Sequence, residues 1–121
     1  MLKKLELPLF PALSLLFLFC LFPLAPAAMA QPPDEARKAG LTRLVRQDCG
    51  SCHGMTLKGG LGKPLLPHDL KEQTASELAD IILDGVPGTP MPGWRGLLSR
   101  DEAYWIARQL KSGAIKRGNV K

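Results

Sequence analysis

The chain has 121 residues, a length that suits one small domain rather than several sizeable cores. Lys and Arg outnumber Asp and Glu by 16 to 11, which gives a net charge of +5, and only 6% of the residues are aromatic. Because the basic residues are scattered, the aromatic-interleaved basic surface typical of nucleic-acid binding is excluded. We interpret the positive charge as a solvated surface or, alternatively, as a docking patch for an acidic partner.

The first 30 residues are predicted to be a secretory signal peptide. Lys3 and Lys4 precede a long apolar run that ends near Leu24, and residues 28–30 form an A-x-A cleavage site. An uncleaved membrane anchor is the alternative, because the run approaches the roughly 20 residues that span a bilayer. Cleavage predicts a periplasmic domain at residues 31–121 with no stable membrane insertion.

Asp34 begins the first predicted helix, which extends to about Asp48. Leu41, Leu44 and Val45 lie at helical spacing, so one face of this helix is apolar. Gly40 inside this helix costs about 1 kcal/mol relative to Ala. It either allows another helix to approach closely or is tolerated without a role.

The next segment reads Cys-Gly-Ser-Cys-His-Gly, and its C-x-x-C-H pattern is typical of c-type haem attachment. On a helical turn, Cys49 lies three residues from Cys52 and four from His53, so all three side chains can reach one face of a flat cofactor. We predict that Cys49 and Cys52 bind haem c through thioether bonds and that His53 ligates the iron.

Two other chemistries use C-x-x-C. A thioredoxin-like redox pair would require a βαβ context, and no strand-rich pattern surrounds the motif. A zinc site needs four ligands, whereas the remaining candidates are His68 and Cys20, which lies in the predicted signal peptide.

A Gly- and Pro-rich segment, residues 54–72, is predicted to be a loop. Because long loops in small domains are usually functional, we expect it to wrap around the haem edge. Thr74 and Glu77 then form a capping box that begins the second helix. Gly85 is predicted to end that helix in a left-handed conformation.

The loop at residues 86–98 contains the predicted second iron ligand, Met91. Pro90 and Pro92 fix the backbone on both sides of Met91, which suits presentation of a thioether at a set position. Met/His ligation is the arrangement of electron-transfer c-type haem sites. The alternatives are that Met91 fills a gap in the core, as most methionines do, or that His68 provides bis-histidine ligation.

Three more residues are predicted to lie near the haem. Trp94 and Arg95 follow the ligand loop, and either could donate a hydrogen bond to a haem propionate. Trp94 could equally pack against the haem or the core. Pro64 is predicted to supply a backbone acceptor for the second ring nitrogen of His53.

Ser99 and Glu102 form a second capping box, which begins the last predicted helix. This helix extends to about Ser112 and ends at Gly113. No strand pattern follows the predicted cleavage site, so an all-α fold with three main helices is expected.

Together these features resemble the class I cytochrome c family over nearly all of residues 31–121. The resemblance implies three main helices wrapped around one covalently attached haem c, and a one-electron carrier rather than an enzyme. In this family the first and last helices cross near a glycine, which favours the packing role for Gly40. The last helix has Tyr104 and Trp105, whereas the commoner family aromatic would stand at Gln109, so the details of the crossing stay open.

Residues 46–62 are particularly similar to the small periplasmic cytochromes c-55X of bacterial denitrification clusters. This resemblance implies an electron donor to cytochrome cd1 nitrite reductase, with a role in d1 haem maturation as an alternative. A gas-binding sensor or enzyme with a labile Met ligand is a further alternative. It would require that Met91 is absent from the iron or easily displaced.

Overall fold

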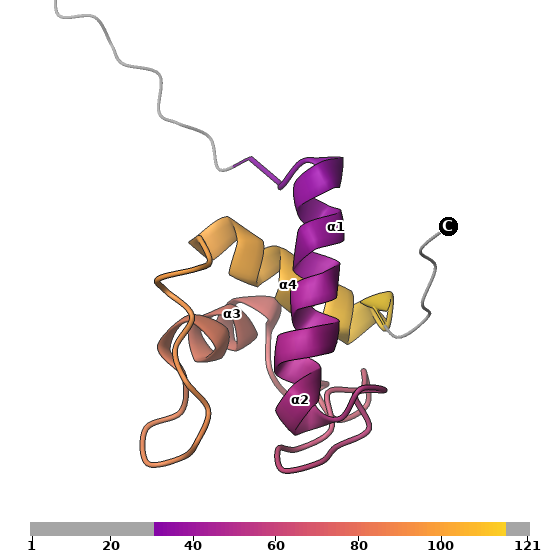
Figure 1. Cartoon of the computed structure of the whole chain (residues 1–121), viewed down its shortest axis with the longest axis vertical. Helices are drawn as coiled ribbons and strands as arrows, with labels where there is room; N and C mark the ends of the chain where they lie inside the picture. Colours follow the sequence, from indigo (N-terminus) through magenta and orange to yellow (C-terminus); the bar gives the residue numbers. More distant parts are fainter. Residues whose placement is uncertain (1–30, 116–121) are drawn as a thin grey trace, which may run out of the picture.

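The computed structural model describes residues 31–115. The predicted signal peptide, residues 1–30, lies outside the described residues, as do residues 116–121. Within the described range all regular secondary structure is helical and no strand is present (Figure 1), in agreement with the predicted all-α fold. No helix in this range is both long and apolar enough to cross a membrane.

Three helical segments follow one another as one continuous rod (Figure 1): α1 (Glu35–Leu44), the π-helical turn η1 (Val45–Cys49) and α2 (Gly50–His53). Asp34 caps the start of the rod, as predicted, because its side chain accepts a hydrogen bond from the N–H of Arg37 at 2.7 Å. The first helix was expected to end near Asp48, whereas helical backbone continues to His53. The C-x-x-C-H segment therefore forms the end of the rod.

Two further helices complete the fold: α3 (Ala75–Asp84) and α4 (Arg100–Ser112). Thr74 and Glu77 form the predicted capping box at the start of α3. Ser99 and Glu102 form the second one at the start of α4. Both local predictions are confirmed.

The glycines that end α3 and α4 adopt different conformations. Gly113 has φ 71° and ψ 15°, the left-handed conformation that commonly ends a helix. Gly85 has φ 69° but ψ −169°, so its backbone turns into an extended direction instead of the predicted left-handed one. This direction leads the chain directly into the loop that contains Met91.

One hydrophobic core joins the rod, α3 and α4. The rod contributes Leu41 and Val45, which are both fully buried. α4 crosses α1 (Figure 1) and buries one face: Ala103, Ile106, Ala107 and Leu110. At the same crossing, Nε of Arg37 donates a hydrogen bond to the carboxylate of Glu102.

Gly40 does not take part in a close helix contact. A Cβ atom at Gly40 would meet only the guanidinium of Arg43, at 4.0 Å. The close-approach interpretation is therefore wrong, and Gly40 is a tolerated glycine on α1. The small residues buried on α4 are Ala103 and Ala107, both with 0% exposure.

Two loops extend from this helical core. The attachment loop, residues 54–74, follows α2, and the ligand loop, residues 85–99, joins α3 to α4. Figure 1 shows α2 and the tips of both loops at the same end of the molecule. The fold thus brings the C-x-x-C-H segment and the Met91 segment to one end.

Candidate haem-binding site

The end of the rod positions both cysteines and the histidine. Cys49 is the last residue of η1, and Cys52 and His53 belong to α2. The two cysteines are not joined in a disulfide, and Cys49 is partly buried against the core whereas Cys52 is exposed. Burial, with a smaller contribution from the charge of Asp48, raises the pKa of the Cys49 thiol to about 11. The two thiols therefore differ in their exposure to solvent.

The π-helical turn η1 directly precedes the cysteine pair. Such turns are rare and occur frequently at functional sites. Here the turn extends from the buried Val45 to Cys49, the first cysteine of the motif. The sequence pattern predicted an ordinary helix over this segment.

The ring of His53 is oriented by the attachment loop. Its Nδ1 lies 2.6 Å from the carbonyl oxygen of Lys63. Because a carbonyl only accepts hydrogen bonds, Nδ1 is the protonated nitrogen and Nε2 presents its lone pair. This is the usual arrangement of a metal-ligating histidine.

The acceptor for His53 was predicted at Pro64, and that prediction is wrong by one residue. The carbonyl at Nδ1 belongs to Lys63. Because a residue before proline is restricted to extended backbone, Pro64 limits the direction in which the Lys63 carbonyl points. The Pro64 ring itself lies 3.2 Å from where a Cβ on Gly59 would stand.

Three glycines of the attachment loop press against the end of the rod. A Cβ on Gly62 would lie 2.8 Å from both Cε1 and Nδ1 of His53, and one on Gly60 would lie 2.7 Å from the carbonyl oxygen of Cys52. The N–H groups of Gly62 and Gly59 donate to the carbonyls of Cys52 and His53, each at 2.8 Å. Gly62 and Lys63 were not identified from sequence, although the clustering of glycines was a signal of close backbone approach.

Met91 is partly buried and lies in a loop that is closed by its own backbone. The N–H of Val86 donates to the carbonyl of Met91 at 3.2 Å. The base of the loop packs tightly on the end of α3. A Cβ on Gly85 would lie 2.6 Å from the Met91 carbonyl oxygen, and one on Gly93 would lie 2.8 Å from that of Leu83. Backbone packing therefore fixes where the ligand loop leaves α3.

Trp94 and Arg95 lie beyond this base. Trp94 is partly buried against the core, in agreement with the packing alternative, and its backbone N–H donates to the carbonyl of Leu83 at 3.0 Å. Arg95 Nε donates to Oδ1 of Asp84 at 2.5 Å, and this hydrogen bond raises the pKa of the guanidinium. A contact between either residue and a haem propionate stays a prediction.

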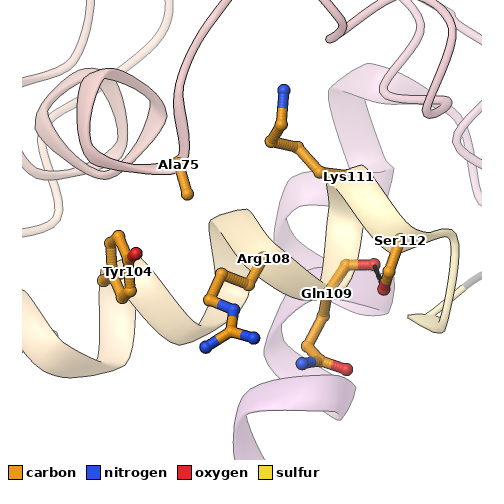
Figure 2. A pocket seen from close by; sticks show the side chains of 6 residues that line it. All are labelled: Ala75, Tyr104, Arg108, Gln109, Lys111 and Ser112. Carbon is orange, nitrogen blue, oxygen red and sulfur yellow. Dashed lines mark hydrogen bonds between the residues drawn. The ribbon is translucent and has the colours of Figure 1, made fainter.

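Two other features stand apart from this site. His68 is exposed, with Nε2 3.3 Å from Oδ2 of Asp69. A shallow polar pocket of about 390 Å³ lies between the start of α3 and α4 (Figure 2) and is lined by six residues: Ala75, Tyr104, Arg108, Gln109, Lys111 and Ser112. No residue predicted to bind haem lines this pocket.

The donor set at the end of the rod fits a haem. Two cysteine sulfurs and an oriented imidazole lie within five residues. Gly62 packs against the imidazole ring at a distance that leaves no room for a side chain. A thioether is available from the neighbouring loop through Met91. Two thiols, an imidazole and a thioether match the chemistry of c-type haem attachment and ligation.

Comparisons with known proteins identify the family. The profile of the family described as "Cytochrome C oxidase, cbb3-type, subunit III" matches residues 36–108. Cytochrome c55X of Paracoccus denitrificans is 56% identical over 87 residues, which cover 72% of this chain and 84% of that protein.

Solved structures agree with this relationship. The c-type cytochrome NirC superposes with a TM-score of 0.67 at 49% identity, covering 69% of this chain and 98% of that one. Dihydro-heme d1 dehydrogenase NirN, in complex with DHE, superposes with a TM-score of 0.53 at 36% identity, but covers 57% of this chain and only 15% of NirN. The chain therefore belongs to the class I cytochrome c family, within the c55X type of denitrification clusters, and its cofactor is one covalently bound haem c.

Proposed function

We propose that this chain is a periplasmic one-electron carrier in which Cys49 and Cys52 attach the haem and His53 and Met91 ligate its iron. The hydrogen bond from His53 Nδ1 to the Lys63 carbonyl is the observation that carries the proposal, because it leaves Nε2 as the ligand atom. The bound haem supplies an Fe(III)/Fe(II) couple. Export to the periplasm rests on the predicted signal peptide.

The role of Met91 in this proposal is to keep the iron six-coordinate in both oxidation states. The closed ligand loop supports this role, since its backbone hydrogen bond at Val86 and its tight base at Gly85 hold Met91 in a defined place. Met/His ligation raises the reduction potential, which suits an electron donor. No residue of the described chain needs to act as an acid, a base or a nucleophile in this function.

The attachment loop offers a surface for a partner. Between Asp48 and Asp69 the sequence contains no acidic residue, while Lys58 and Lys63 are both exposed. Charge complementarity therefore favours an acidic surface on the partner. We propose cytochrome cd1 nitrite reductase as this partner, with electrons leaving the carrier at the haem end of the molecule.

A second candidate is supported by the similarity to dihydro-heme d1 dehydrogenase. A dehydrogenase releases electrons, and a one-electron carrier that resembles part of it is a suitable acceptor. In this candidate function the chain takes part in maturation of d1 haem and accepts electrons instead of delivering them to nitrite reductase.

Spectroscopy of the purified holoprotein tests the ligand set. The ferric wild type should show a sulfur-to-iron charge-transfer band, and Met91→Ala should lose it while keeping its covalent haem. Met55→Ala is the matched control, because Met55 is 67% exposed and should leave the band unchanged. A wild type without the band, whose ferrous form binds CO readily, would instead support a sensor or enzyme with an open iron position.

Stopped-flow kinetics separates the two electron-transfer roles. The ferrous protein is mixed with purified cytochrome cd1 nitrite reductase, and the ferric protein with dihydro-heme d1 dehydrogenase and its substrate. Rapid oxidation in the first mixture supports the donor role. Rapid reduction in the second mixture without oxidation in the first supports the maturation role.

A further inference from the structure

The tip of the ligand loop, residues 86–91, has few backbone donors with which to hold its shape. Pro87 and Pro90 lack an N–H group, and so does Pro92 directly after Met91. All five residues from 86 to 90 are exposed, so burial in the core does not fix this tip. Hydrogen bonds inside the loop therefore act together with the packing of Met91 on Gly85 to hold Met91 in place.

The hydroxyl of Thr89 lies at the centre of these hydrogen bonds. Its Oγ1 donates to the carbonyl of Val86 at 2.7 Å and accepts from the N–H of Met91 at 3.3 Å. The backbone N–H of Thr89 also donates to the Val86 carbonyl, at 3.1 Å. A hydroxyl can donate one hydrogen bond and accept two, so this side chain links both ends of the tip at once.

Met91 is thereby fixed on both sides of its Cα atom. Its N–H is bound to the Thr89 hydroxyl, and its carbonyl accepts the N–H of Val86 at 3.2 Å. Pro90 and Pro92 restrict the neighbouring backbone. Without the hydroxyl, the Met91 N–H would lose its hydrogen-bond acceptor inside the loop. The neighbouring Pro90 and Pro92 have no N–H that could form a substitute hydrogen bond.

We propose that Thr89 is a positioning residue, whose hydroxyl holds Met91 toward the haem iron and limits its displacement by external ligands. This inference rests on the proposed ligation of the iron by Met91. Thr89 does not touch the iron itself. Its effect is on the equilibrium between a bound and a detached Met91.

The test compares Thr89→Val with Thr89→Ser in the ferric holoprotein, with imidazole as the competing ligand. Thr89→Val keeps the shape and the β-branch but removes the hydroxyl, whereas Thr89→Ser keeps the hydroxyl. Loss of a hydrogen bond of ordinary strength should allow Thr89→Val to bind imidazole about fivefold more tightly. Thr89→Ser, and a Thr56→Val control in the attachment loop, should stay within about twofold of the wild type by the same reasoning. The sulfur-to-iron band should weaken in parallel with imidazole binding.

The outcomes separate this inference from the proposed function. If the wild type lacks the sulfur-to-iron band and Met91→Ala binds imidazole as the wild type does, the ligand assignment fails and the positioning role with it. If Met91→Ala loses the band but Thr89→Val binds imidazole as the wild type does, only the positioning role is overturned. Thr89→Ser behaving like Thr89→Val would also overturn it, because the hydroxyl would then be irrelevant.

Discussion

The two loops at the haem end are held in place in different ways. The attachment loop is bound to the end of the rod by backbone hydrogen bonds to Cys52 and His53, and it also buries Leu57 and Leu70 in the core. The ligand loop packs on α3 at its base and on the core through Trp94 and Leu98, but its tip, residues 86–90, is exposed. The proposed ligand His53 is therefore held by contacts with another segment of the fold, whereas the proposed ligand Met91 depends largely on hydrogen bonds and packing within one short loop. Regions with few buried contacts open most easily, so the methionine side is expected to be the exchangeable one.

The largest effect should follow from changing the packing against the histidine. Gly62→Ala would place a Cβ atom 2.8 Å from Cε1 and Nδ1 of the His53 ring, whereas comfortable carbon contacts are about 3.5–4.0 Å. Because the ring is also bound to Lys63, it must move or lose that hydrogen bond. Overpacking of this kind costs about 1–3 kcal/mol, so we expect a roughly tenfold or greater loss of correctly ligated holoprotein. The measurements are the yield of covalent holoprotein and the spin state of its ferric iron.

Gly96→Ala is the control for this variant. No atom lies within 4 Å of the position a Cβ would take on Gly96, so this substitution should have little effect on either measurement. Full yield and an unchanged ferric spectrum in Gly62→Ala would show that the histidine side is not built into the fold as described.

The second prediction concerns the base of the ligand loop. Gly93→Ala would place a Cβ atom 2.8 Å from the carbonyl oxygen of Leu83 and 3.0 Å from that of Asp84, so the loop must move away from α3. At about 1–3 kcal/mol, this overpacking should make imidazole binding to the ferric iron on the order of tenfold tighter. The haem should stay attached and His53 should stay bound. Loss of haem attachment in Gly93→Ala, to the same degree as in Gly62→Ala, would remove the distinction between the two loops.

Much of this fold was predictable because the signals are local. The capping residues Asp34, Thr74 and Ser99 each bind a backbone N–H within three residues, so their sequence context alone determines where the helices begin. The C-x-x-C-H motif is equally local. It predicted the cofactor, and the family relationship agrees with it.

The errors arose where distant segments meet. The carbonyl that accepts from His53 lies ten residues further along the chain. Whether it belongs to Lys63 or to Pro64 depends on how the attachment loop folds back onto the ring, and the sequence alone does not show this. The close-approach role of Gly40 was one of two alternatives and was favoured by the family resemblance, but in this chain the buried small residues are on α4. Gly62 and Gly93 matter because of atoms far away in sequence, and no local pattern distinguishes them from the unconstrained Gly96.

The smallest predicted effect should come from weakening the contact between α1 and α4, away from the tips of both loops. Glu102 joins the capping box of α4 to Arg37 on α1. The Arg37 guanidinium lowers the pKa of this carboxyl below its ordinary value; burial opposes this effect, while the N–H of Ser99 adds to it. Because the pKa is lower in the folded state, the stabilisation is present above about pH 4.3 and is lost as the pH falls through the folded-state pKa.

Glu102→Gln keeps an amide that can complete the capping box but removes the charge opposite Arg37. At pH 7 we expect its free energy of unfolding to be about 0.5–1 kcal/mol lower than that of the wild type. This difference between variant and wild type should disappear as the pH falls below about 4.3. Urea unfolding of the ferric holoprotein between pH 3 and 7 measures both values.

Glu77→Gln is the matched control, since Glu77 fills the same position in α3 but binds the backbone N–H of Thr74 instead of an arginine on another helix. Imidazole affinity at pH 7 should be unchanged in Glu102→Gln. If the imidazole affinity of Glu102→Gln changed as much as that of Gly93→Ala, the displacement of Met91 would depend on the stability of the whole fold and not on the ligand loop alone.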